Sequence, residues 1–297
     1  MDEEEISKLK KAGQIAVQTI EYARSIIKPQ MPLLEIAEKI EAHIVQLGAK
    51  PAFPINLSIN EIAAHSTPQF NDTQVARGLL KADIGCHIDG YVADTAFSID
   101  LESSKENQEL IEAAETALEK AAEIIKINSQ LKEIGSAISK EINSRGFLPI
   151  TNLSGHSIGK YDLHAGITIP NYDNSQTLSL QEGLYAIEPF VTLSTATGSV
   201  KDGKPSGIYH LENSALPRDS FARSVLQFIK EEYSSLPFCS RWLVKKFGSR
   251  ALVALRQMEQ AKILHQYPQL IEKSGGKVAQ AEHTILLTKS EKIITTQ

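Results

Sequence analysis

The stretch that decides the fold is DIGCHIDGYVADTAFSID, residues 83–100. Two runs rich in β-branched and aromatic residues flank the pair Asp89-Gly90, a strong short-range signal for a hairpin turn. Leu80 to Leu101 is therefore predicted to form two antiparallel strands. Asp83 and Asp94 stand on either side of the turn, and we expect them to lie across from one another near the same end of the ribbon. At the spacing of cross-strand neighbours, about 4.5–5.5 Å, two carboxylates can share metal ions. The alternative is that one aspartate caps a turn and the other is solvated on a sheet edge.

Helical patterns surround this hairpin on both sides. Apolar residues at helical spacing predict helices over Glu4–Ile27 and Leu33–Leu47 before it, and over Asn107–Ile127 and Leu131–Arg145 after it. A second strand-rich block begins near Ile150. Two helices, a loop and a hairpin are thus followed by two helices, a loop and more strands. This order suggests two pseudo-equivalent halves whose helices pack outside one curved sheet.

Residues 211–275 break this rhythm and are predicted to be mainly helical. Because β-patterned runs return afterwards, we expect the block to be an insertion into a catalytic domain made of residues 1–210 and 276–297. The basic residues in the middle of the block are Arg241, Lys245, Lys246 and Arg250. They are interpreted as a solvated helix face, and contact with ribosomal RNA is the alternative.

Composition restricts the class of protein. The chain has 297 residues, 42% of them apolar and 23% charged, which is ordinary for a globular protein. Its formal net charge of −5 gives no overall attraction to nucleic acid or to an anionic membrane. Two cysteines are too few for a disulfide framework, so we expect both thiols to be reduced and buried. The acidic N-terminus is not a secretory signal and no apolar run is long enough to span a bilayer, so a cytoplasmic protein without membrane or DNA partners is expected.

Several acidic and histidine residues are candidates for a functional site because of the segments in which they lie. Glu188 interrupts the apolar run LYAIEPFV, and Glu282 lies within VAQAEHTILL. Glutamate is rarely buried unless it is paired or coordinated, although on an edge strand it can also guard against aggregation. His156 and His164 lie in small-residue loops, where a histidine is either a ligand or ordinary polar surface.

These side chains together make a donor set for divalent metals. The aspartates of the hairpin, the two glutamates and one histidine offer four carboxylates and one neutral nitrogen. Four clustered negative charges repel one another, and neutralising them takes about two divalent cations. The set suits Mn²⁺, Co²⁺, Fe²⁺ or Zn²⁺ in a pair about 3.5–4 Å apart. Two such metals activate water and polarise a carbonyl, so amide hydrolysis is the expected chemistry.

Five segments of the chain, in this order and with similar separations, resemble the methionine aminopeptidases. They are PAFPINLSINEIAAHSTP, DIGCHIDGYVADTAFSID, SGHSIGKYDLHAG, EGLYAIEPFVT and VAQAEHTILL. The resemblance covers essentially the whole chain. It implies an α+β pita-bread (creatinase/aminopeptidase) fold, with a pseudo-twofold curved antiparallel sheet and outer helices. The ligands that it implies are Asp83, Asp94, His156, Glu188 and Glu282.

The resemblance also implies a role for each ligand. Asp94 and Glu282 correspond to the residues that bridge two metals, and Asp83 completes one metal site. His156 and Glu188 complete the other site, and Glu188 is also the candidate general base that takes a proton from the attacking water.

Four further residues match positions that contact substrate in this family. His164 corresponds to the histidine that contacts the substrate carbonyl, and His65 of AAHSTP to the histidine near the scissile amide. Phe53 of PAFP and Tyr267 of YPQL correspond to aromatic residues that line the methionine pocket. An aromatic residue in an apolar segment is also compatible with plain core packing.

The helical block between Glu188 and Glu282 resembles the insertion that distinguishes type 2 enzymes from type 1. No charged or zinc-binding extension precedes the first helix, which favours an archaeal-like form. We expect a monomer that acts on the N-termini of nascent polypeptides, with transient ribosome contact as a further interaction.

Two other kinds of protein share this fold. Prolidases and aminopeptidase P have a similar ligand set but carry an additional N-terminal domain, for which His65 and Asp83 come too early in this chain. Non-catalytic relatives use a basic helical block for RNA or partner binding, but they lose metal ligands that are all present here.

Overall fold

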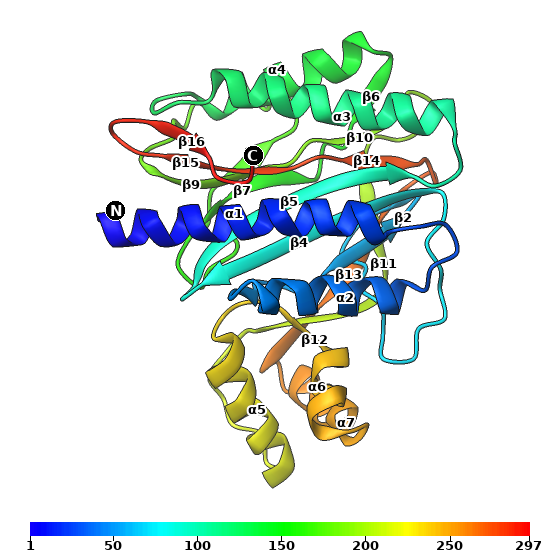
Figure 1. Cartoon of the computed structure of the whole chain (residues 1–297), viewed down its shortest axis with the longest axis vertical. Helices are drawn as coiled ribbons and strands as arrows, with labels where there is room; N and C mark the ends of the chain where they lie inside the picture. The colour runs from blue at the N-terminus through cyan, green and yellow to red at the C-terminus, as the bar shows by residue number, and fades with distance from the viewer.

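The structure is a computed structural model that describes residues 1–297 (Figure 1). Seven helices are present: α1 Glu3–Ile26, α2 Leu33–Gln46, α3 Lys105–Ile124, α4 Leu131–Ser144, α5 Ser220–Tyr233, α6 Ser240–Phe247 and α7 Arg250–Gln260. The first four agree with the predicted helices to within three residues at each end. None of the seven is both long and apolar enough to cross a membrane.

Sixteen strands complete the chain. The first eight are β1 Lys50–Pro51, β2 Asn56–Ile59, β3 Ile62–Ala64, β4 Leu79–Ile88, β5 Tyr91–Asp100, β6 Phe147–Pro149, β7 Ser154–Ile158 and β8 Thr168–Pro170. The others are β9 Gly183–Ile187, β10 Phe190–Leu193, β11 Val200–Leu211, β12 Phe238–Cys239, β13 Leu264–Glu272, β14 Val278–Gln280, β15 His283–Leu287 and β16 Lys292–Ile294. All strand pairs that join them are antiparallel.

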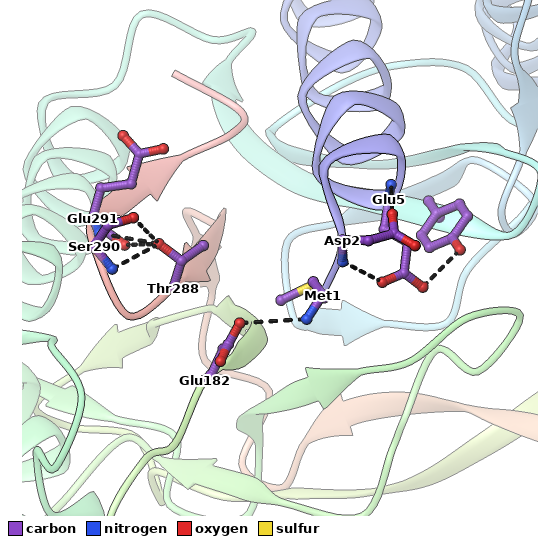
Figure 2. A network of polar contacts seen from close by, with 8 residues as sticks. Met1, Asp2, Glu5, Glu182, Thr288, Ser290 and Glu291 are labelled. Carbon is purple, nitrogen blue, oxygen red and sulfur yellow. Dashed lines mark hydrogen bonds and ion pairs between the residues drawn. The ribbon is translucent and has the colours of Figure 1, made fainter.

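The first helix begins with a complete capping box. Asp2 accepts a hydrogen bond from the Glu5 amide, and the Glu5 carboxylate accepts one from the Asp2 amide. The other Glu5 carboxylate oxygen accepts from the Tyr91 hydroxyl, which ties the start of α1 to β5. Figure 2 shows these contacts beside the Met1 amino group, which lies 3.4 Å from a carboxylate oxygen of Glu182. The same view shows Thr288, whose hydroxyl accepts hydrogen bonds from the Ser290 and Glu291 amides and closes the β15–β16 hairpin.

The predicted hairpin is confirmed, but Asp83 and Asp94 are not cross-strand partners as expected. Asp89 and Gly90 form its two-residue turn with φ of 51° and 86°, and two positive φ angles are the signature of a type I′ turn. This turn makes Ala96 the cross-strand partner of Asp83, whereas Asp94 pairs with Gly85. The two aspartates are therefore diagonal neighbours on one face of the ribbon, not directly opposite, because the register is set by the centre of the turn.

Two apolar cores lie under two pairs of helices. One cluster gathers α1, α2 and the inner residues of β4 and β5, and the other gathers α3, α4 and the strands that follow them. In Figure 1 α1 crosses in front of the β4–β5 hairpin, while α3 and α4 lie at the top of the molecule. An isolated bridge between Ala96 and Glu282 joins the strands of the two halves. The helices cover the outside of a curved sheet, and the sheet's inner side is left for the site.

Helices α5 to α7 form a separate apolar cluster with the ends of β11 and β13. Figure 1 shows them projecting from the end of the molecule opposite α4. The block 211–275 is not purely helical, because β13 lies within it and pairs with β11 and β3. Sequence alternation in β13 is weak, and most of its residues are half-buried.

One prediction about this block is wrong. Arg241 is not on a solvated face: only 3% of it is exposed, and its guanidinium makes a bidentate ion pair with Glu41 at 2.7 Å for both bonds. Lys245 stays at the surface, and Lys246 and Arg250 lie over the rings of Phe228 and Phe221. Arg241 therefore does not belong to the exposed basic residues of the block, because its ion pair with a residue about 200 positions away in sequence buries it.

Both cysteines are free and buried, as expected. Cys86 faces the core under α1, where its thiol donates to the Ala12 carbonyl. It therefore points away from the aspartates of the same hairpin, as strand alternation predicts.

Candidate metal centre

The five predicted ligands come from five different places in the fold. Asp83 lies on β4, Asp94 on β5 and His156 on β7, while Glu188 and Glu282 occupy the short links β9–β10 and β14–β15. All five line one cavity of about 400 Å³. The structure therefore brings together residues that are separated by up to 199 positions in the sequence, from Asp83 to Glu282.

Hydroxyl groups fasten the strands that carry Asp94 and Glu282. The Thr284 hydroxyl accepts from the Asp94 amide at 2.8 Å and donates to the Asp94 carbonyl at 2.7 Å. The Thr95 hydroxyl donates to the Glu282 carbonyl at 2.8 Å, and the Glu282 amide donates to the Ala96 carbonyl. Because both backbones are held this way, the two carboxylates have little freedom to move apart.

The side-chain donors converge closely. Potential ligand atoms of Asp94, His156 and Glu282 all lie within 4.8 Å of one another. His156 Nε2 is 3.7 Å from an Asp94 oxygen and 3.6 Å from a Glu188 oxygen. Asp83 Oδ1 and Asp94 Oδ1 are buried and have no hydrogen-bond partner in the protein. Open acceptors of this kind, next to a neutral imidazole, fit the coordination of divalent metals.

Electrostatics point the same way. Burial raises the pKa of Asp83 to about 7, although hydrogen bonding to Gln280 partly opposes this. Burial, followed by the neighbouring carboxylates, raises the pKa values of Asp94, Glu188 and Glu282 well above their ordinary range. Ionising all four carboxylates side by side is unfavourable in the protein alone. Bound divalent cations would neutralise the negative charges and so favour the ionised forms.

The histidines of the cavity are neutral at physiological pH. Burial, and next the neighbouring His164, lowers the pKa of His156 to about 3. Desolvation by the surrounding protein lowers the pKa of His164, although the residue is exposed in its loop, and burial lowers the pKa of His65 to about 4. The His156 and His164 rings meet edge to face, with centroids 4.4 Å apart. A neutral His156 can offer a lone pair to a metal, and a neutral His164 can donate a hydrogen bond.

The predicted substrate-binding residues lie in the same cavity. His65 follows β3 with φ of 56°, and its ring is 5.1 Å from that of Tyr267 between centroids. Phe53 packs over Gly85, where an added Cβ would come within 2.1 Å of the Phe53 ring. A side chain at position 85 would therefore displace the aromatic wall beside the aspartates.

Some lining residues were not predicted from the sequence. Asn56, Ile208, Phe190 and Leu270 also face the cavity. Asn56 lies in the segment that contains Phe53 and His65, so its neighbourhood was a signal. Ile208 and Leu270 carried none, because an apolar residue in a strand is typical of any core.

The family model for "Metallopeptidase family M24" matches residues 7–289. The chain belongs to this family, and it is a metal-dependent hydrolase.

Within the family, the chain aligns end to end with archaeal methionine aminopeptidases. It is 48% identical to the methionine aminopeptidase of Pyrococcus abyssi, with 99% of this chain and 100% of the relative covered. The methionine aminopeptidase of Pyrococcus horikoshii is 47% identical over the same shares. At this identity and coverage, the chain is a member of the methionine aminopeptidase group.

Solved structures agree on the fold. A thermophilic Arx1 superposes with a TM-score of 0.85 at 15% identity, covering 99% of this chain and 91% of that one. A methionine aminopeptidase from Thermotoga maritima gives 0.71 at 22% identity, covering 100% and 98%. The predicted α+β pita-bread architecture is therefore confirmed.

Proposed function

We propose that the protein removes the N-terminal methionine from nascent polypeptides when the second residue is small, using two divalent metal ions. The observation that carries this proposal is the single cavity that four carboxylates line together with His156 and apolar side chains, with Asp94 and Glu282 buried and Asp83 and Glu188 partly buried. Asp83, Asp94, His156, Glu188 and Glu282 would hold the metals, and Co²⁺, Mn²⁺, Fe²⁺ and Zn²⁺ all suit this donor set. The methionine aminopeptidase relatives support the choice of substrate.

Bound metals would supply Lewis acidity to the scissile carbonyl and acidify a water molecule. The protein's own groups do the rest. Glu188 is partly buried beside His156, where its carboxylate can take the proton of the attacking water. His164 donates a hydrogen bond to the carbonyl oxygen as negative charge develops there. His65, on the Tyr267 side of the cavity, would contact the scissile amide.

The apolar walls account for selectivity. Phe53 and Tyr267 would hold the methionine side chain by aromatic contact with its thioether. At about 400 Å³ the cavity is near the small end of ligand pockets, so little space remains for a bulky second residue. Helices α5–α7 lie between Glu188 and Glu282 in sequence and favour the type 2 class.

An assay on three peptides tests the proposal. Metal-loaded protein should cleave Met-Ala-Ser, should leave Met-Lys-Ser largely intact, and should not prefer Ala-Pro. A preference for Ala-Pro would favour a prolidase activity. No turnover of any peptide with Co²⁺, Mn²⁺, Fe²⁺ or Zn²⁺ would contradict the proposed activity.

A further inference from the structure

Asn56 is a polar residue of the cavity that the mechanism does not use. It begins β2, and its Cα is the register partner of Asp83 on β4. Its side chain lines the same cavity as the five candidate ligands, and only 5% of the residue is exposed. A buried amide in such a place needs partners for both of its polar atoms.

One hydrogen bond determines how this amide is oriented. Asn56 Nδ2 donates to the Pro54 carbonyl at 2.9 Å. A carbonyl oxygen only accepts, so the nitrogen must be the end that faces Pro54. Asn56 Oδ1 is therefore the free end, and it is buried with no hydrogen-bond partner in the protein. A buried acceptor without a donor is destabilising, which makes it a candidate for contact with a ligand.

The chemistry of the neighbours indicates which ligand group this acceptor takes. Asp83 and Asp94 also present unpartnered acceptors, and as carboxylates they suit metal ions. Asn56 is uncharged, so it accepts a hydrogen bond without adding a fifth negative charge to a cluster that already resists ionisation. The substrate of an aminopeptidase brings one strong donor, its free α-amino group.

We propose that Asn56 Oδ1 accepts a hydrogen bond from the α-amino group of the substrate and thereby selects a free N-terminus. The inference rests on the proposed function. It places the amino end of the substrate beside β2 and β4, on the Asp83 side of the cavity. The carbonyl end then lies toward His164, whose ring packs against His156.

The chain offers a matched control in Asn152, which lines the same cavity. Its Oδ1 accepts from the Val200 amide at 2.7 Å, and its Nδ2 donates to the Val200 carbonyl at 2.8 Å. Both polar atoms are therefore satisfied within the protein. A variant at Asn152 should change stability without changing recognition of an amino group.

The experiment compares two ligands that differ only in the amino group, L-methioninol and 4-(methylsulfanyl)butan-1-ol. Their dissociation constants are measured by calorimetry on the metal-loaded full chain, with metal content checked for every variant. Wild type should prefer the amine, and Asn56→Leu should reduce that preference by about ten- to a hundredfold, the range for a hydrogen bond to a charged group. Asn152→Leu should leave the preference unchanged. Asn56→Ala, which removes the same acceptor with a smaller side chain, should behave like Asn56→Leu and covers the case in which the leucine variant does not fold.

The two ways in which this test can fail are separable. If both ligands weaken equally in the Asn56 variants, or if the preference for the amine persists, Asn56 does not bind the amino group and the inference is wrong. The proposed function would then still stand. If wild type neither binds L-methioninol nor cleaves Met-Ala-Ser, the proposed function fails, and this inference fails with it.

Discussion

Among single residues, His164 and Asp94 share one cavity but should give different defects when removed. His164 is not among the candidate ligands, whereas Asp94 has an open buried oxygen beside His156. We expect His164→Ala to retain bound metal and to lose about 10²–10⁴-fold in kcat, the usual size of a lost catalytic hydrogen bond or proton transfer. Asp94→Ala should lose metal as well as turnover. Elemental analysis beside steady-state kinetics separates the two, and a His164→Ala variant with near-normal kcat would rule out its proposed role.

His87 makes the β4–β5 hairpin sensitive to acid. Its Nδ1 accepts a hydrogen bond from the Gly90 amide at 3.0 Å, which requires the neutral ring. Burial, and next the charge of Lys50, lowers its pKa to about 4. Because the folded state binds the proton less tightly than the unfolded state, the stability contribution is full above pH ~6.5 and is lost as the pH falls toward ~4.

The matched variant is His87→Asn, which keeps an acceptor but cannot be protonated. Relative to it, wild type should lose up to about 3 kcal/mol of unfolding free energy between pH 7 and pH 4. Urea titrations of both proteins at several pH values provide the measurement. Parallel pH profiles would show that His87 does not titrate in this range.

Among elements, α6 fastens the helical block to the rest of the molecule. Arg241 pairs with Glu41 of α2, and its Nε donates to the Pro68 carbonyl at 3.1 Å. Trp242 Nε1 donates to the same Glu41 carboxylate, and the Ser240 hydroxyl donates to Gln69. Residues 68 and 69 follow His65 closely, so α6 also braces the loop that carries this histidine.

Breaking this buried pair on one side should be costly. Arg241→Met leaves the Glu41 carboxylate buried without its cation, and we expect a loss of about 3–5 kcal/mol in unfolding free energy. The double variant Glu41→Leu/Arg241→Met should recover much of that loss, because no charge remains unpaired. Arg24→Met is the control, since its contact with Glu115 is half-exposed at 3.8 Å and worth less than about 1 kcal/mol. Equal losses in the single and double variants would contradict a role for the charge pair.

The same elements show what could be predicted from the sequence and why the rest could not. Helix α1 and the β4–β5 hairpin follow from local rules, since helical periodicity and the Asp89-Gly90 turn depend only on nearby residues. Predicting which residue pairs with Asp94 requires counting the register outward from the centre of that turn. Burial of Arg241 was not predictable, because its partner Glu41 lies on a helix 200 positions earlier in sequence. Pattern alone shows a basic residue on a helix, but not what the helix packs against.

In the whole molecule, the candidate metal centre lies where the two halves meet. Asp83 and Asp94 come from the hairpin under α1 and α2. His156 comes from β7, and Glu188 and Glu282 from the links β9–β10 and β14–β15, in the half covered by α3 and α4. Without metal, four carboxylates, two buried and two partly buried, line one cavity at this junction. The shared core can hold them together only while enough of them remain protonated or are neutralised by cations.

Removing the metals should therefore destabilise the protein more as the pH rises. Carboxylates whose pKa is raised on folding stabilise the metal-free protein fully below their unfolded pKa, near 4, and this contribution is lost as the pH rises through the folded value, about 7 for Asp83. The difference in Tm between metal-loaded and chelated protein should grow from about pH 5.5 to pH 8, and other titrating groups cancel in that difference. Asp94→Asn removes one charge from the cluster, so its chelated form should lose less Tm over this range than chelated wild type. A difference in Tm that stays constant with pH would show that the carboxylates do not repel one another in the metal-free fold.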